Sequence, residues 1–241
     1  LDWDIVPSNM GGRTRVIMYD PNDDAGNKVW AGGVTGGLWY NNNIVNNLNS
    51  WAPVDDFWPS LSISSITFDP NNPQVFYVGT GEAFTSRVIY RESSGTGAGI
   101  FKSEDAGQTW QQLQSTLDWK YVTDLEIRDE NGSSVIDAGL ASGVYNREEL
   151  SERTEGLSRS TTDGGTLDRW LPSIGQTNDP YAVADIEITA ANRIMVGSMA
   201  NLDGAGGATI LYSDEGLPGT WTIYDDYIAI IEANPDYYIP N

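Results

Sequence analysis

The segment Ser103-Glu104-Asp105-Ala106-Gly107-Gln108-Thr109-Trp110 decides the fold that we predict for this 241-residue chain. Its small and polar residues favour a tight hairpin turn, because the Asp105 carboxylate can accept hydrogen bonds from N–H groups of its own loop. Gly107 supplies the positive φ that such a turn needs. Trp110 then places a large apolar ring beside the turn. We therefore predict a β-hairpin whose turn is held by Asp105.

Three other segments carry variants of this turn, and each variant is followed by a tryptophan. The four positions aligned with Asp105 are separated by 62, 58 and 51 residues (105−43, 163−105 and 214−163). This spacing indicates a repeated structural unit. The residues assigned to the turns are Ser103, Asp105, Gly107, Thr109 and Trp110 in the complete copy, Asp163, Gly165 and Trp170 in the next, Asp214, Gly216 and Trp221 in the last, and Asn43 with Trp51 in a degraded first copy.

Each turn lies between the third and fourth of four short apolar stretches. In the second unit these are residues 64–69 (Ser-Ser-Ile-Thr-Phe-Asp), 74–79 (Gln-Val-Phe-Tyr-Val-Gly), 99–103 (Gly-Ile-Phe-Lys-Ser) and 110–113 (Trp-Gln-Gln-Leu). Alternation of apolar with polar residues in the opening stretches is typical of half-buried strands. We predict an all-β chain of four-stranded antiparallel units at about 13–56, 61–116, 121–173 and 181–225, with residues 226–241 beginning a further segment.

The composition excludes several classes of function. The 13 Lys and Arg against 34 Asp and Glu give a net charge of −21, which disfavours nucleic acid as a partner because binding it needs a basic surface. An anionic membrane surface is disfavoured for the same reason, and no apolar run is long enough to insert across a bilayer. The chain contains no Cys and no His, so disulfides, thiolate metal sites and a histidine base are excluded.

The complete turn at 103–110 and its partial copies resemble the Asp-box, or BNR repeat, of sialidases, sortilin-type receptors and xyloglucan-active glycosidases. This resemblance covers nearly the whole chain. It implies a β-propeller, of which about four blades are present as part of a larger propeller. Phrases such as Gly11-Gly12-Arg13-Thr14-Arg15 and Gly79-Thr80-Gly81-Glu82 look most like large secreted bacterial propeller proteins carried by the type IX secretion pathway. That likeness implies a secreted or cell-surface location and contact with the secretion machinery.

The resemblance implies that the loops between the second and third strands of each blade form the binding face. Residues 82–98 and 142–155 form the two longest of these loops, and long loops on a rigid scaffold are where binding residues concentrate. Their charged and aromatic side chains suit a polar ligand such as a glycan or a cell-surface protein, with plain solvated surface as the alternative. The candidate ligand-binding residues are Glu82, Arg87, Tyr90, Arg91 and Arg147.

No catalytic set is recognisable in this segment. Sialidases carry their first arginine in an Arg-Ile-Pro element, which the chain lacks. Xyloglucan-active glycosidases carry an aspartate just before the Gly-Gly that leads into the third strand, where this chain has Val34-Thr35-Gly36-Gly37. Since glycoside hydrolysis needs two carboxylates, we expect no catalytic residues here. The alternative is a carbohydrate-active hydrolase whose acid and base lie partly outside this segment.

Calcium is the one cofactor for which the sequence offers ligands. Asp20, Asp23 and Asp24 lie close together and supply hard oxygen ligands of the calcium type. They do not follow the spacing of an EF-hand loop, and an ordinary Asp-rich turn is the alternative interpretation.

These observations lead to one main hypothesis and two alternatives. The main hypothesis is a secreted or cell-surface propeller that acts as a scaffold for binding or adhesion. The alternatives are the hydrolase described above and a purely architectural repeat within a larger surface assembly or secretion cargo.

Overall fold

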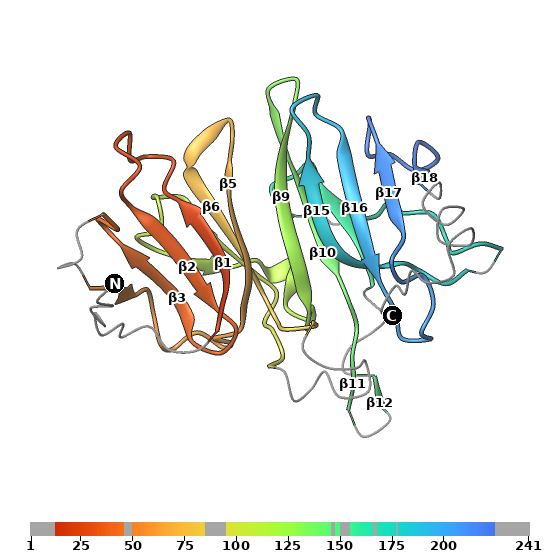
Figure 1. Cartoon of the computed structure of the whole chain (residues 1–241), viewed down its shortest axis with the longest axis horizontal. Helices are drawn as coiled ribbons and strands as arrows, with labels where there is room; N and C mark the ends of the chain where they lie inside the picture. Colours follow the sequence, from red (N-terminus) through yellow and green to blue (C-terminus); the bar gives the residue numbers. More distant parts are fainter. Residues whose placement is uncertain are drawn as a thin grey trace, which may run out of the picture.

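The chain forms four sheets of four antiparallel strands each, which confirms the predicted all-β class (Figure 1). Within each sheet the strands lie in sequence order, so every unit is a simple meander. No α-helix occurs in the described part of the chain. The computed structural model describes residues 13–45, 50–84, 95–145, 148–149, 155–165, 168–176 and 178–224.

The four sheets are numbered here in chain order, and their strands have these bounds. Sheet 1 contains β1 (Thr14–Tyr19), β2 (Val29–Gly33), β3 (Gly37–Asn41) and β4 (Ala52–Pro53), and sheet 2 contains β5 (Ile63–Asp69), β6 (Asn72–Thr80), β7 (Ile100–Ser103) and β8 (Gln111–Gln112). Sheet 3 contains β9 (Val122–Glu130), β10 (Ser133–Leu140), β13 (Gly156–Ser160) and β14 (Asp168–Arg169), and sheet 4 contains β15 (Ala182–Ile188), β16 (Ile194–Met199), β17 (Ile210–Ser213) and β18 (Thr222–Tyr224).

The sheets stand side by side and contact one another through their first strands, β1, β5, β9 and β15 (Figure 1). β1 contacts β5, β5 contacts β9, and β9 contacts β15. Among the described strands, β15 makes no comparable set of contacts with β1. The four sheets therefore form an open arc and not a closed ring.

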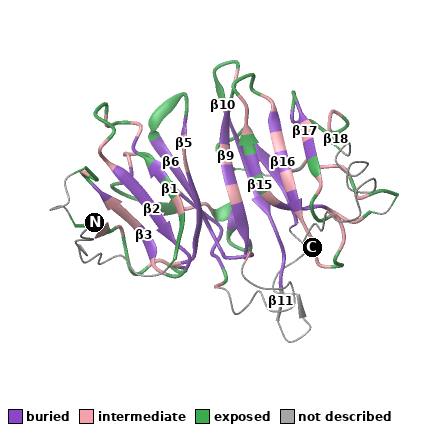
Figure 2. Cartoon of the chain, in the orientation of Figure 1, coloured by how far each residue is buried: buried purple, intermediate pink, exposed green. Residues whose placement is uncertain are grey.

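Among the described residues, apolar side chains form four core clusters, and three of these fill the spaces between neighbouring sheets. Met18 and Trp30 of sheet 1 pack with Phe76 of sheet 2, and Tyr77 of sheet 2 packs with Leu125 of sheet 3. A third cluster joins Leu157 of sheet 3 to several residues of sheet 4. Figure 2 accordingly shows buried residues along the strands and exposed residues in the turns. Each sheet is thus stabilised by its neighbours, as in other repeat architectures.

A knob-and-hole contact repeats where each sheet meets the next. The first strand of every sheet has a register irregularity near its start, and the residue just before it is β-branched in all four sheets. We call this β-branched residue the knob. In sheets 2, 3 and 4 the knob lies against a glycine on the second strand of the preceding sheet, and we call this glycine the hole. A Cβ added to that glycine would lie only 2.4–2.7 Å from the knob side chain, so a larger residue does not fit. The pairs are Ile63 on Gly32, Val122 on Gly79 and Val183 on Gly139.

Two small elements were not expected from the sequence. A two-stranded hairpin forms from β11 (Val144–Tyr145) and β12 (Glu148–Glu149), and a short 3-10 helix spans Gln114–Thr116. Each is too short to produce a periodic sequence signal. None of the helices described is long and apolar enough to cross a membrane.

Candidate functional site

The last residue of every third strand holds the turn that follows it. Asn41, Ser103, Ser160 and Ser213 are all buried. In each case a side-chain oxygen accepts the backbone N–H of the residue two positions later, at 2.8–3.3 Å. Such a bond mimics a backbone turn and fixes the exit from the strand. This serine or asparagine, and not the aspartate, is the feature that all four turns share.

Asp105 adds further hydrogen bonds in sheet 2. Its carboxylate accepts the backbone N–H of Thr109 at 2.8 Å, the Thr109 hydroxyl at 2.6 Å and the Ser103 hydroxyl at 2.8 Å. The two bonds from Thr109 are the main reason that the pKa of Asp105 is lowered to about 2. The indole N–H of Trp110 donates to the carbonyl of Gly107 at 3.1 Å. All five residues assigned to the complete turn therefore lie together in one hydrogen-bonded loop.

Replacing Asp105 with alanine is expected to lower the thermal midpoint at neutral pH by about 2–4 °C, the shift that about 1 kcal/mol produces in a chain of this length. The pKa of Asp105 is lowered on folding, so its contribution is present above the ordinary pKa of the carboxyl and is lost as the pH falls through about 2. Differential scanning calorimetry of both proteins at several pH values between about 2 and 7 measures the difference in thermal midpoint. A difference between the two proteins that does not shrink in acid would contradict the assignment.

In sheet 3 the alignment of Asp163 with Asp105 is wrong by one residue. The Ser160 hydroxyl accepts the N–H of Thr162 and of Gly164, as the Ser103 hydroxyl accepts those of Asp105 and Gly107. Asp163 has φ 56°, like Ala106, and Gly164 has φ 79°, like Gly107. Thr162 therefore occupies the position of Asp105, and Gly164, not Gly165, is the left-handed glycine. The carboxylate of Asp163 points out of its own turn.

In sheet 4 the turn has one residue fewer between the strand-end serine and the glycine than the turn of sheet 2 has. The Ser213 hydroxyl accepts the N–H of Glu215 and of Gly216, so Asp214 lies one residue before the position of Asp105. Its carboxylate binds the guanidinium of Arg193 at 2.6 and 3.1 Å. The Thr220 hydroxyl, not a carboxylate, links the two ends of this loop through Ser213 and Leu217. Trp170 and Trp221 are half-buried, and their indole N–H groups have no hydrogen-bond partner among the residues that the structure describes.

In sheets 2, 3 and 4 the left-handed glycine of the turn lies against a large side chain of the preceding sheet. A Cβ on Gly107 would lie 2.3 Å from the Trp30 ring, and one on Gly164 would lie 2.6 Å from Leu113. A Cβ on Gly216 would lie 2.6 Å from Arg128. These glycines are therefore required twice, for their positive φ and for close approach between sheets. Position and spacing in the sequence reveal the first requirement but not the second.

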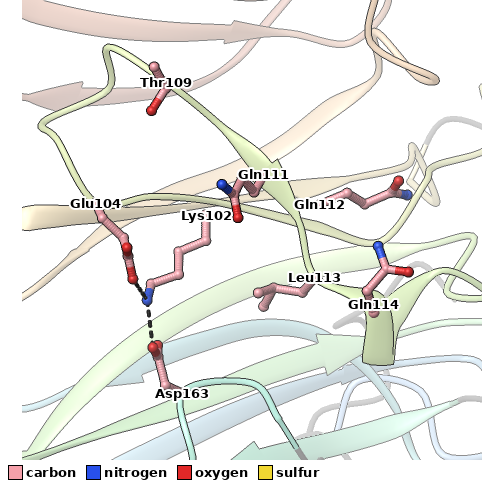
Figure 3. A pocket seen from close by; sticks show the side chains of 8 residues that line it. All are labelled: Lys102, Glu104, Thr109, Gln111, Gln112, Leu113, Gln114 and Asp163. Atoms are coloured by element: carbon pink, nitrogen blue, oxygen red, sulfur yellow. Dashed lines mark hydrogen bonds and ion pairs between the residues drawn. The ribbon is translucent and has the colours of Figure 1, made fainter.

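Between the turns of sheets 2 and 3 lies a groove of about 330 Å³ (Figure 3). The Lys102 ammonium contacts the carboxylates of Glu104 and Asp163, each at 2.5 Å, and so links the two sheets. One side of the groove carries three glutamines, and the amide of Gln112 is held by the carbonyl of Ala98 at 2.6 Å. The lining residues are Lys102, Glu104, Thr109, Gln111, Gln112, Leu113, Gln114 and Asp163.

A second hollow of about 420 Å³ lies beside this groove and shares Lys102, Glu104 and Asp163 with it. The hydroxyl of Tyr77 donates to Asp163 at its base. Burial, followed by the hydrogen bond to Asp163, raises the pKa of Tyr77, so this phenol stays protonated. The Lys102–Asp163 contact therefore forms a bridge between two adjoining polar hollows, and Asp163 belongs to this surface and not to its own turn.

Sheets 3 and 4 face each other across buried charges. Arg128 and Arg159 are 1% and 4% exposed at their side chains, and both bind the carboxylate of Glu130. The Arg128 guanidinium also donates to the carbonyls of Asp214, at 3.3 Å, and Glu215, at 2.8 Å, in the turn of sheet 4. Charged groups this far from water are retained only when they are paired. The alternation of apolar and polar residues in the sequence of sheet 3 did not reveal that one face of this sheet carries buried charges.

Three carboxyl groups on this face of sheet 3 are protonated more readily than usual. Burial raises the pKa of Asp124 to about 7 and that of Asp137 to about 7. Burial, together with the nearby charge of Asp124, raises the pKa of Glu126 to about 8. Asp137 is fully buried, and its two oxygens accept no hydrogen bond from the described residues, although the Nε of Arg128 lies 3.8 Å from one of them. These groups lie inside the contact between sheets, away from the groove of Figure 3.

Of the predicted ligand-binding residues, the structure describes only Glu82. Its side chain is 3% exposed; the carboxylate accepts the N–H of Phe84 at 2.7 Å and lies 3.6 Å from the guanidinium of Arg13. Arg87, Tyr90, Arg91 and Arg147 lie outside the described residues.

The predicted calcium ligands have other partners. Asp20 is buried and binds the Trp30 indole N–H at 3.0 Å, the Lys28 ammonium at 2.7 Å and the N–H of Asn22 at 2.9 Å. Asp23 accepts three backbone N–H groups of its own loop, while Asp24 is exposed. No group of three or more acidic, His or Cys side chains suited to a metal is found in the described ranges. The carboxylates of Asp20 and Asp23 therefore hold the turn that follows β1.

Comparison with known proteins identifies relatives by fold only. No protein-family model matches the chain, and no curated protein matches it. Among solved structures, an ancestral GH74 enzyme is 18% identical over 88% of this chain with a TM-score of 0.59. The GH74 xyloglucanase of Xanthomonas campestris is 14% identical over 88% with a TM-score of 0.52, and the GH74 enzyme of Niastella koreensis is 18% identical over 86% with a TM-score of 0.51.

The chain spans only a quarter to three tenths of these structures, covering 25%, 29% and 28% of their lengths in the same order. Sequence identity at this level shows the fold alone. Together with the four meander sheets and their open arc, it establishes that the chain has the fold of a partial β-propeller.

Proposed function

We propose that this chain is part of an extracellular Asp-box β-propeller that binds glycans as a scaffold, with the groove between sheets 2 and 3 as its binding surface. The observation that carries the proposal is the polar lining of that groove (Figure 3). Amides, a hydroxyl, an ammonium and carboxylates line it side by side, and these groups can pair with the many hydroxyls of a sugar. Its volume of about 330 Å³ lies within the range of small-molecule sites.

The order already present in the groove favours binding. Glu104 and Asp163 both hold Lys102, and Gln112 is held by Ala98, so few side chains must be immobilised when a ligand enters. Gln111 and Gln114 are exposed and remain available to a ligand. The names of the GH74 structures that share the fold agree with a glycan as the class of ligand.

The same geometry argues against hydrolysis in this groove. A glycoside hydrolase of the usual kind needs one carboxyl as proton donor and a second as base or nucleophile. Here both carboxylates contact one ammonium. Neither is placed to act as a proton donor while Lys102 remains between them.

Binding to a glycan array, followed by calorimetric titration with the best ligand and with xyloglucan oligosaccharides, tests the proposal. The double variant Gln111→Ala, Gln114→Ala is expected to bind at least about tenfold more weakly, which corresponds to about 1.4 kcal/mol. Gln176→Ala, an exposed glutamine beyond sheet 3, is the matched control and should bind normally. Absence of binding to any glycan, or equal affinity in the double variant, would refute the groove as the site.

The alternative location for the same function is the surface of the long loops. Its candidate residues are Glu82, Arg87, Tyr90, Arg91 and Arg147. Arg91→Ala distinguishes the two surfaces, because it lowers glycan affinity only if the ligand lies on the loops. A cell-surface protein is the alternative class of partner. If the array is negative, affinity capture with the chain as bait tests for it.

Hydrolysis of a glycan is the second candidate function, and it draws on the names of the GH74 structures alone. It requires catalytic carboxylates in parts of the longer protein beyond this segment. Release of reducing sugar from xyloglucan by the full-length protein would establish hydrolysis.

Secretion through the type IX pathway stays a proposal that rests on the sequence resemblance. Retention of the protein inside cells that lack the pathway would support it, and export from such cells would contradict it.

A further inference from the structure

The groove of Figure 3 and the second hollow beside it are two ends of one crevice between sheets 2 and 3. They share Lys102, Glu104 and Asp163, whose contacts form the bridge between them. On the side of sheet 2, the rest of the groove is lined by the turn after β7 and by β8, and the rest of the second hollow by β5 and β6. Because the strands of this sheet lie in the order β5-β6-β7-β8, the crevice runs across them.

The length of the crevice indicates the size of its ligand. β5 and β8 are three strand spacings apart, which is about 14 Å at about 4.8 Å for each spacing. The groove of about 330 Å³ and the second hollow of about 420 Å³ each have the size of a small-molecule site. A single sugar unit fits within one of them, so a ligand that contacts both ends must be a chain of several units.

The second hollow offers the same kinds of polar group as the groove. The amide of Asn72 and the hydroxyl of Thr161 line it, and both residues are exposed. The hydroxyl of Ser134 is already held by Asp69 at 2.6 Å. From below, the hydroxyl of Tyr77 donates to Asp163 and so fixes the bridge. Sugar hydroxyls can therefore pair with groups that are largely ordered before the ligand enters.

The charge that a ligand meets in the crevice is negative. The side chain of Lys102 is 11% exposed, whereas those of Glu104 and Asp163 are 75% and 57% exposed. Asp69 adds a third carboxylate to the lining of the second hollow. Carboxylate oxygens accept hydrogen bonds from uncharged sugar hydroxyls, but they repel the carboxylates of acidic sugars.

We propose that the crevice binds an uncharged oligosaccharide that crosses the Lys102–Asp163 bridge, with some sugar units in the groove and others in the second hollow, and that it excludes acidic glycans. This inference rests on the glycan binding proposed above for the groove. It adds a second binding region beyond the bridge, a minimum length for the ligand and a selection by charge.

Calorimetric titration of the 241-residue chain tests the length and the charge of the ligand. The probes are the disaccharides and hexasaccharides of cellulose, mannan and xylan, and the acidic hexasaccharide of polygalacturonate. At least one uncharged hexasaccharide is expected to bind at least about tenfold more tightly than its own disaccharide, because it contacts both hollows. It should also bind at least about tenfold more tightly than hexagalacturonate, and added salt should narrow this second difference.

A double variant tests the second hollow. Asn72→Ala, Thr161→Ala is expected to weaken binding of the uncharged hexasaccharide at least about fivefold and to change binding of the disaccharide less than about twofold, because only the longer ligand reaches these residues. Asn42→Ala, an exposed asparagine in the turn of sheet 1, is the matched control and should leave both affinities unchanged. Thermal midpoints equal to that of the wild type check that the variants are folded.

Glu104→Gln tests the selection by charge. The amide keeps the shape of the side chain, and Asp163 still holds Lys102. Binding of hexagalacturonate is expected to improve at least about threefold, because one exposed like charge is removed. Asp203→Asn removes the same charge from an exposed position in the loop between β16 and β17 and should have no such effect.

The outcomes separate failure of this inference from failure of the proposed function. If a glycan binds and Gln111→Ala, Gln114→Ala weakens it, but Asn72→Ala, Thr161→Ala does not, the groove is a glycan site and the longer crevice is refuted. Equal affinities for disaccharide and hexasaccharide, or for hexagalacturonate and the uncharged chains, would also overturn the inference. Absence of binding by every uncharged probe and by the glycan array would overturn both.

Discussion

Replacing Trp30 with alanine is expected to lower the free energy of unfolding by about 3–5 kcal/mol, the range for deleting a buried aromatic side chain. Trp30 is 2% exposed and lies between sheets 1 and 2. Its ring packs against Tyr40, Phe76 and Trp110 with centroids 5.3, 5.7 and 6.4 Å away. The turn glycine Gly107 also rests on it. Loss of the ring therefore opens a cavity beneath the turn at residues 103–110.

Chemical denaturation monitored by circular dichroism measures this effect. Trp30→Phe should cost less than the alanine change, because it keeps most of the ring but removes the N–H that Asp20 accepts at 3.0 Å. Phe57→Ala is the matched control, since Phe57 is 94% exposed and its loss should change the free energy of unfolding very little. Equal effects of Trp30→Ala and Phe57→Ala would contradict the packing described.

The stability of the chain is expected to fall progressively as the pH rises from about 4 to about 8, because of the carboxyl groups between sheets 3 and 4. The pKa values of Asp124, Glu126 and Asp137 are raised to about 7, 8 and 7 in the folded chain by burial. The folded state therefore binds more protons than the unfolded state between these values and the ordinary pKa of about 4. Their favourable contribution is complete below about pH 4 and is lost above about pH 8.

Glu126→Gln isolates this effect, because the amide cannot ionise. The variant should unfold at a higher temperature than the wild type at about pH 9 and at a similar temperature at about pH 5, since each unit of pKa difference corresponds to about 1.4 kcal/mol. Asp118→Asn is the control: Asp118 is exposed, and its substitution should shift both temperatures equally or not at all. If the difference in unfolding temperature between Glu126→Gln and the wild type does not grow with pH, ionisation of Glu126 does not destabilise the folded chain and the prediction is wrong.

The repeat made the fold predictable, whereas the alignment of individual turn residues was less secure. The third copy places an aspartate beside two glycines, and the obvious alignment takes Asp163 as the equivalent of Asp105. The hydrogen bonds of Ser160 instead align Thr162 with Asp105. A turn can gain or lose a residue while its strands keep their register, so spacing alone does not identify which side chain faces the loop. The common signal was the strand-end residue, a serine in three copies.

The candidate site was less predictable than the fold, because it lies between two repeats. Lys102 and Asp163 are 61 residues apart and meet only because sheets 2 and 3 stand side by side. Neither residue differs in the sequence from an ordinary charged residue on a turn. The same holds for Arg128, whose guanidinium reaches a turn of sheet 4 more than eighty residues away.

The sequence by itself determined the all-β class, the four meander units and the hydrogen-bonded turn at residues 103–110, because alternation and short-range hydrogen bonding act within a few residues of each other. Only the tertiary structure decided which faces of the sheets are apolar and which are ionic, and where Asp163 and Asp214 direct their carboxylates. The physical reason is that these outcomes depend on side chains contributed by a neighbouring sheet, some fifty or more residues distant, which no local pattern specifies.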